Sequence, residues 1–324
     1  MDERTLPPPP ADQPGPEVCY RHPNIVTGVH CTRCGRPICP DCMNPAPVGH
    51  HCPTCIAEAR REFRKGPGRR IAVANARATS LTALTLATIG VMFIVQVVVG
   101  GPENLLDPNT FDLIDMGGAV PALIADGQWW RLLSSMFLHA GILHLLLNGW
   151  GLYLFGSVVE LQTYGRLRYA VIFLVSGFIG SVASYAMQGA GDLRGLVIPS
   201  VGASGAIFGL LGAVMVYAYR RRNTPVGRAY LNWAIMIIVL NAVIGSQVAG
   251  IDIVAHIGGA VGGALCALVA EYGRGRRDAA VWEWLGYGAI VAAGIVVTVQ
   301  HTAVLGGSPE VRAALEFLRQ VAAP

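Results

Sequence analysis

The sequence predicts an all-α membrane protein with several spanning helices, and composition, apolar segments and loop charges all point to it. Of 324 residues, 53% are hydrophobic, only 14% are charged and 40 are glycine, which is unusual for a soluble domain of this length. Seven apolar segments are each close to the about 20 residues that a spanning helix needs. Because backbone polar groups cannot stay unsatisfied in lipid, these segments are expected to be helices. They cover residues 79–100, 142–161, 167–187, 203–219, 229–248, 253–271 and 284–305.

The charges of the connecting loops predict the orientation of these helices. If the N-terminus is cytoplasmic, the inner segments hold sixteen Lys and Arg residues and the outer segments four. Cytoplasmic loops of membrane proteins carry such an excess of basic residues. We therefore expect a multi-pass protein of the cell membrane with its N-terminus in the cytoplasm and its C-terminus outside.

Four segments flank the predicted helical domain at 79–305. Residues 1–16 are proline-rich and predict a disordered lead, and residues 17–56 hold seven of the eight cysteines. Residues 57–78 form a basic linker that would set the topology and could also attract anionic membrane lipid. Residues 306–324 are expected to be an outer C-terminal tail. The scattered basic residues form no stripe on a soluble face, so nucleic acid is not expected as a partner.

The cysteine-rich module carries four pairs of metal-ligand residues, each pair separated by two residues. The pairs are Cys19/His22, Cys31/Cys34, Cys39/Cys42 and Cys52/Cys55. Eight ligands suffice for two tetrahedral Zn²⁺ ions. A disulfide knot is the alternative, and a reducing cytoplasm disfavours it. About 40 residues bury little core, so two structural zinc ions would supply most of the folding energy.

Polar side chains inside apolar helices are costly, and four of them are candidate site residues. His144 and Asn148 are four residues apart and therefore share one helical face. Ser204 begins the fourth predicted helix, and His256 lies near the outer end of the sixth. All four are expected at a similar depth, within about 10 Å of the outer helix ends.

Glycines on the fourth and sixth helices predict that these two helices pack closely. Gly205, Gly209 and Gly212 follow Ser204, and Gly259 and Gly263 share a face with His256. Small residues at such spacing let helix backbones approach in lipid. The alternative is that the glycines only tighten packing. A serine and a histidine at matching depth favour a functional reading.

Four motifs together resemble those of the rhomboid family of intramembrane serine proteases. They are Trp130-Arg131, His139-x4-His144-x3-Asn148, Gly202-Ala203-Ser204-Gly205 and Ala255-His256-x-Gly258-Gly259. Each would be weak alone, but their order and their helices agree with the family. The resemblance covers about residues 79–271. It implies a rhomboid-like bundle of six helices plus one, preceded by the zinc-stabilised cytoplasmic module.

The resemblance also implies a catalytic apparatus that needs no cofactor. Ser204 would be the nucleophile and His256 its base, with Phe208 packed on the His256 ring, and no acid is expected to orient that ring. His144, Asn148 and the Ser204 backbone N–H would stabilise the oxyanion. The implied reaction is hydrolysis of peptide bonds in transmembrane substrate proteins. His139, Arg131 and Glu160 are read as structural.

The module in turn resembles the B-box zinc finger, whose ligand pairs interleave. That resemblance implies one zinc on Cys19, His22, Cys39 and Cys42, and another on Cys31, Cys34, Cys52 and Cys55. The last cysteine pair replaces a histidine pair of that family, so His50 or His51 remains an alternative ligand. A cytoplasmic protein partner for the module is a hypothesis.

Three other functions are alternatives to the protease. A channel or transporter would place its polar residues near the midplane, within inverted repeats that are not evident here. An inactive rhomboid-like protein that binds membrane clients is the main alternative, although both Ser204 and His256 are present. A zinc module with the helices as a mere anchor does not account for the polar residues in those helices.

Overall fold

The computed structural model describes residues 16–46, 48–65, 80–189, 191–247, 250–274 and 277–321. The described residues form two compact units, one ending at Lys65 and the other starting at Ser80. The proline-rich lead up to residue 15 and residues 66–78 of the predicted linker lie outside the described residues. Each unit is taken by itself.

The N-terminal unit is built around its cysteines. It contains the 3-10 turn η1 (Pro40–Cys42), the antiparallel strands β1 (Asn44–Pro45) and β2 (His50–His51), and the helix α1 (Pro53–Lys65). Its buried core consists of Ile38 and six of its seven cysteines, while Cys34 is exposed. Helix α1 runs across the boundary predicted at residue 56.

The second unit is a helical bundle, and within the described residues each of the seven predicted segments forms a helix. Five are long and apolar enough to cross a membrane, counting α7 with its π-helical extension η4 (Val159–Thr163), and α10 is a shorter apolar helix. The predicted multi-pass helical membrane protein is therefore confirmed. The helices are α3 (Leu81–Gly100), α7 (Ile142–Val158), α8 (Arg166–Ala186), α10 (Ser204–Arg220), α11 (Pro225–Gln247), α12 (Ile253–Gly273) and α13 (Ala279–Leu305).

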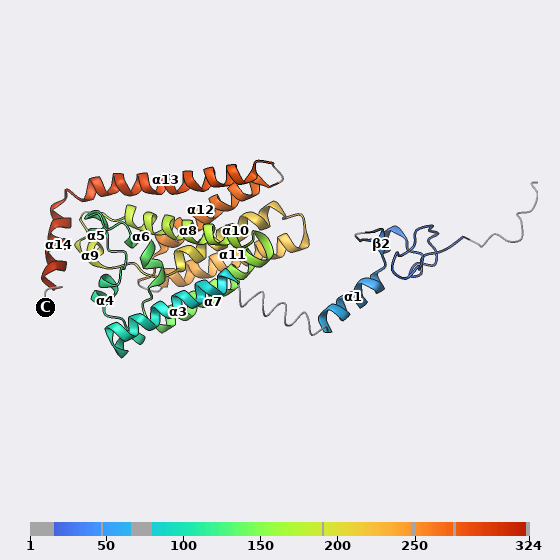
Figure 1. Cartoon of the computed structure of the whole chain (residues 1–324), viewed down its shortest axis with the longest axis horizontal. Helices are drawn as coiled ribbons and strands as arrows, with labels where there is room; N and C mark the ends of the chain where they lie inside the picture. Colours follow the sequence, from blue (N-terminus) through green and yellow to red (C-terminus); the bar gives the residue numbers. More distant parts are fainter. Residues whose placement is uncertain are drawn as a thin grey trace, which may run out of the picture. The chain divides into compact units, whose positions relative to one another are not determined.

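Helix α10 lies inside the bundle and contacts α7, α8, α11 and α12. Ten of its residues are buried, most of them Gly, Ala, Leu or Val. Helices α3 and α13 lie on opposite sides of the bundle (Figure 1) and leave most of their apolar residues exposed. Apolar side chains on such outer faces suit a lipid environment.

Short helices gather at one end of the bundle, which is called the loop end below. They are η2 (Pro102–Leu105), α4 (Thr110–Asp115), α5 (Pro121–Ala125), α6 (Arg131–Ser134), η3 (Ser135–Phe137), α9 (Leu193–Val197) and α14 (Pro309–Val321). The predicted C-terminal tail is thus largely the helix α14, which packs on α5 and α9 (Figure 1). Its buried residues Val311, Ala314 and Leu318 recur at helical spacing, so one apolar face covers the loop end.

Buried carboxylates tie the other end of the bundle together. Glu160 accepts hydrogen bonds from the backbone N–H groups of Leu81 and Thr82, both of 2.8 Å, at the start of α3. Glu283 forms an ion pair with Arg168 at 2.8 Å. These contacts lie where α3, α8 and α13 begin, so charged side chains hold the helices together at that end of the bundle.

Candidate functional site

Ser204 and His256 lie within hydrogen-bond distance of each other at the loop end. His256 Nε2 is 2.8 Å from Ser204 Oγ, although the residues are 52 positions apart. Ser204 is the first residue of α10, and His256 lies in the first turn of α12. Both side chains are partly buried, so the pair lies below the surface without being sealed from it.

Glycines make this approach of α10 and α12 possible. A Cβ atom on Gly259 would lie 2.0 Å from the Gly205 carbonyl oxygen, and one on Gly263 would lie 1.9 Å from the Gly209 carbonyl oxygen. No side chain fits in that space. The backbones therefore meet directly along the face that the sequence analysis identified.

The His256 ring is stacked on Phe208, one turn after Ser204 on α10. The ring centroids are 4.2 Å apart and the planes differ by 10°. This contact holds the imidazole edge toward the serine hydroxyl. It also shields one face of the ring from water.

His144 and Asn148 lie on α7, beside the segment that leads into Ser204. The His144 ring packs against Gly202, where a Cβ atom would be 2.7 Å from His144 Cε1. Gly202 adopts φ +120°, which other residues rarely do, so this close approach requires glycine. Asn148 is buried, and its side-chain N–H donates to the His144 carbonyl oxygen at 2.9 Å.

Three side chains with structural contacts lie on the segments beside these groups. His139 is fully buried and packs edge-on against His144, with ring centroids 5.3 Å apart. Gln96 of α3 holds the His139 backbone through two hydrogen bonds of 3.0 Å. Arg131 donates to the carbonyl oxygens of Ile114 and Gly118 and so ties the long connection before α7 together.

Asp252 caps α12 one turn before His256. Its Oδ1 accepts from the Ala255 backbone N–H at 2.9 Å, and its Oδ2 accepts from the hydroxyls of Ser184 and Ser200. Asp252 was not predicted as a site residue from the sequence. Gln96 was also missed, and a polar residue inside an apolar segment was the available signal.

The chemical capacity of this arrangement is that of an activated hydroxyl. Unprotonated His256 Nε2 can accept the Ser204 proton, which makes Oγ a nucleophile. The first N–H groups of α10 have no partner within the helix, so its N-terminus favours negative charge beside Ser204. The fold and the site together define a polytopic membrane protein with a partly buried serine–histidine pair.

The chain belongs to the rhomboid family. The rhomboid domain model matches residues 126–272. Rhomboid protease AarA of Providencia stuartii is 32% identical over 229 residues, covering 66% of this chain and 79% of AarA. Rhomboid protease GluP of Bacillus subtilis (strain 168) is 39% identical over 184 residues, covering 57% of this chain. That match spans only 33% of the length of GluP. RHOMBOID-like protein 4 of Arabidopsis thaliana is 35% identical, and the match spans 41% of its length.

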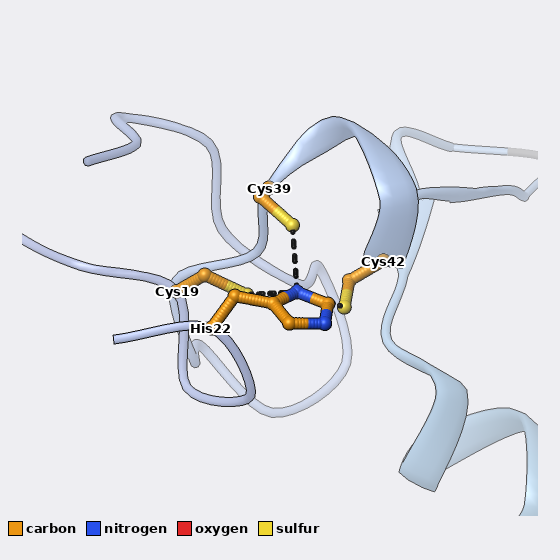
Figure 2. Close-up of side chains that lie close together, drawn as sticks. All are labelled: Cys19, His22, Cys39 and Cys42. Atoms are coloured by element: carbon orange, nitrogen blue, oxygen red, sulfur yellow. Dashed lines mark hydrogen bonds between the residues drawn. The ribbon is translucent and has the colours of Figure 1, made fainter. Parts of the chain in front are cut away.

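The N-terminal unit contains two groups of four possible metal ligands. The first is Cys19, His22, Cys39 and Cys42, whose ligand atoms all lie within 4.8 Å of one another. Figure 2 shows the His22 ring between the sulfurs, with Nδ1 3.1 Å from Cys39 Sγ and 3.6 Å from Cys42 Sγ. Ligands of a tetrahedral zinc ion are about 3.5–3.8 Å apart, given bonds of about 2.0–2.3 Å. The donor set fits zinc.

The second group is Cys31, Cys34, Cys52 and Cys55, in the interleaved arrangement that was expected. His50 and His51 form strand β2 and are not members of either group. Arg36, which sequence reasoning missed, donates to Cys34 Sγ at 3.3 Å. That hydrogen bond lowers the pKa of the Cys34 thiol to about 6 and favours the thiolate that metal binding requires.

Proposed function

We propose that this protein is an intramembrane serine endopeptidase that hydrolyses peptide bonds of transmembrane proteins. The observation that carries the proposal is the 2.8 Å contact between Ser204 Oγ and His256 Nε2 at the start of two helices in a membrane bundle. A hydroxyl and an imidazole at this distance form a sufficient nucleophile and base. The names of the relatives GluP and AarA, both rhomboid proteases, support the same activity.

The proposed reaction has two halves. Ser204 Oγ attacks the peptide carbonyl carbon while His256 Nε2 takes the hydroxyl proton, and the C–N bond breaks as that proton passes to the leaving amine. Water then attacks the acyl carbon while His256 takes its proton, and the bond from that carbon to Ser204 Oγ breaks as His256 returns the proton to Oγ. The oxyanion of each tetrahedral intermediate would accept hydrogen bonds from His144, Asn148 and the Ser204 backbone N–H.

The proposed substrate is a membrane-spanning helix that unwinds near the loop end. Ser204 and His256 both lie in the first turn of their helices, so the site is shallow enough for water to reach. A peptide bond inside a regular helix is shielded by its neighbours. A locally extended segment would expose its carbonyl carbon to Ser204.

We further propose that the loop end faces outward and the N-terminal unit lies in the cytoplasm. Arg220 ends α10 at the opposite side of the bundle, and Arg221 and Arg222 follow it, in keeping with the excess of basic residues in cytoplasmic loops. An impermeant maleimide applied to intact cells should label Ser308→Cys but not Asn223→Cys. Labelling of Asn223→Cys but not of Ser308→Cys would show that the orientation is the reverse of the one proposed.

In the cytoplasm, the N-terminal unit would hold two structural zinc ions, one on each group of ligands. The ligand chemistry, the ligand distances and the buried cysteine core support this assignment. The ions would supply no catalytic chemistry. A protein partner of this unit and contact of the basic linker with membrane lipid are parts of the same proposal.

The test of the proposed activity uses the full chain in liposomes with a model transmembrane substrate. Wild type should cut the substrate, whereas Ser204→Ala and His256→Ala should remain folded and cut nothing detectable. Ser308→Ala, which changes a serine at the start of α14, is the matched control and should cut like wild type. Cleavage by Ser204→Ala at the wild-type rate would overturn the proposal, and a folded but inactive wild type would favour the client-binding alternative.

A further inference from the structure

Two hydrogen bonds join the segments that carry Ser204 and His256. The first is the contact of Ser204 Oγ with His256 Nε2 at 2.8 Å. The second lies four residues earlier on both segments, where Ser200 Oγ donates to Asp252 Oδ2 at 2.7 Å. Both pairs are separated by 52 positions in the chain. The two contacts are therefore successive links between the same two segments.

Both residues of the second link, Ser200 and Asp252, form further hydrogen bonds. Asp252 Oδ2 also accepts from the hydroxyl of Ser184, a buried residue near the end of α8, at 2.5 Å. Asp252 Oδ1 caps α12 through the Ala255 N–H, and the Asp252 carbonyl oxygen accepts from the His256 backbone N–H at 3.2 Å. Ser200 is held in turn by two backbone hydrogen bonds of 3.0 Å to Ala119.

The Asp252 carboxylate suits this position electrostatically. A carboxylate only accepts hydrogen bonds, and this one faces three donors. It also lies at the N-terminus of α12, where the helix dipole favours negative charge. One side chain thus connects the end of α8, the segment before α10 and the start of α12.

We infer that Asp252 is a positioning residue for the Ser204–His256 pair. It does not touch the reacting atoms. It sets the height and rotation of α12 against the segment that enters α10, so that Nε2 faces Oγ at bonding distance. The inference rests on the proposed function, because positioning matters only if the pair reacts.

The alternative is that Asp252 only caps α12, and Ser200 separates the two roles. Ser200→Ala removes the link to the Ser204 segment but leaves the cap on the Ala255 N–H and the bond to Ser184. A purely capping Asp252 predicts no effect of Ser200→Ala on turnover. A positioning Asp252 predicts that Ser200→Ala lowers kcat.

The experiment measures kcat and KM of the full chain in liposomes at a temperature where each variant is folded. Asp252→Ala and Ser200→Ala should each lower kcat by about 10- to 100-fold, as a misplaced reacting group does, with KM within about twofold of wild type. Asp252→Asn keeps an acceptor for Ala255 and should recover part of kcat. The double variant Asp252→Ala/Ser200→Ala should lose no more than Asp252→Ala, because both changes break one link.

Asp192→Ala is the matched control, since Asp192 caps α9 at the same loop end through the Gly195 N–H. It should leave kcat and KM unchanged. A wild-type kcat in Ser200→Ala would overturn the inference, even if Asp252→Ala failed to fold. The proposed function would stand in that case, provided that Ser204→Ala is inactive. An inactive wild type would overturn the proposed function and this inference with it.

Discussion

Gly259 on α12 lies so close to Gly205 on α10 that a Cβ atom at position 259 would be 2.0 Å from the Gly205 carbonyl oxygen. No methyl group fits at that distance. Gly205 directly follows Ser204 and Gly259 lies one turn after His256, so any separation of the helices there also separates the two reacting groups. The packing of α10 against α12 therefore sets the distance between Ser204 and His256.

Gly259→Ala should accordingly damage both stability and activity. Forcing a methyl group into a filled space costs about 1–3 kcal/mol and shifts the backbone. We expect a lower midpoint of thermal unfolding in detergent and at least about a 10-fold lower turnover, because misplacement near a reacting pair is costly. Gly288→Ala on α13 is the control, since a Cβ atom there meets nothing within 4 Å. An unaltered Gly259→Ala variant would disprove the close contact.

Replacement of Phe208 tests the ring contact with His256. Stacked aromatic pairs contribute about 0.5–1.5 kcal/mol, so Phe208→Ala should lower kcat roughly 2- to 12-fold through a less ordered imidazole. Phe208→Tyr preserves the stacking face and should keep most of the activity. Phe317→Ala, at a half-exposed position of α14, is the control that should not change kcat. Equal kcat in Phe208→Ala and wild type would remove Phe208 from the site.

His144→Ala and Asn148→Ala test the proposed oxyanion donors. Loss of one such donor typically costs about 100- to 1000-fold in kcat with little change in KM. Asn241 on α11 offers a matched control, because its side chain also donates to the carbonyl four residues earlier, at 2.9 Å. Asn241→Ala should retain the wild-type kcat. If Asn148→Ala behaved like Asn241→Ala, its amide would serve only the helix.

Metal analysis of the purified full chain tests the N-terminal unit. We expect two zinc ions per chain, and about one in Cys39→Ser, which removes a ligand of the first group only. Cys266→Ser changes the one cysteine outside the N-terminal unit and should leave two. Because zinc would supply most of the folding energy of the unit, a chelator should expose it to proteolysis. A metal-free, protease-resistant unit would contradict the zinc assignment.

The sequence predicted the helices well because lipid imposes a strict length and polarity on each spanning segment. The seven segments follow from that rule. The candidate metal ligands of the N-terminal unit could also be predicted from the sequence, because two ligands separated by two residues can bind the same metal ion.

Contacts between distant segments could not be predicted in the same way. Nothing in the local pattern shows that Asp252 meets Ser184 and Ser200, or that Gln96 holds the His139 backbone. Residues 306–324 were predicted only as an outer tail, and the pattern did not show that three of their apolar residues form the face that packs α14 on the loop end. Such pairings depend on the assembled bundle, which a single sequence does not reveal.

Labelling with a fluorophosphonate serine probe tests most directly whether Ser204 is an activated nucleophile, because it needs no knowledge of the substrate. The probe forms a stable bond only with an activated serine hydroxyl. We expect labelling of wild type and of Ser308→Ala at the same rate, and no labelling of Ser204→Ala or His256→Ala. Equal labelling of wild type and Ser204→Ala, or a folded wild type that never reacts, would contradict this expectation.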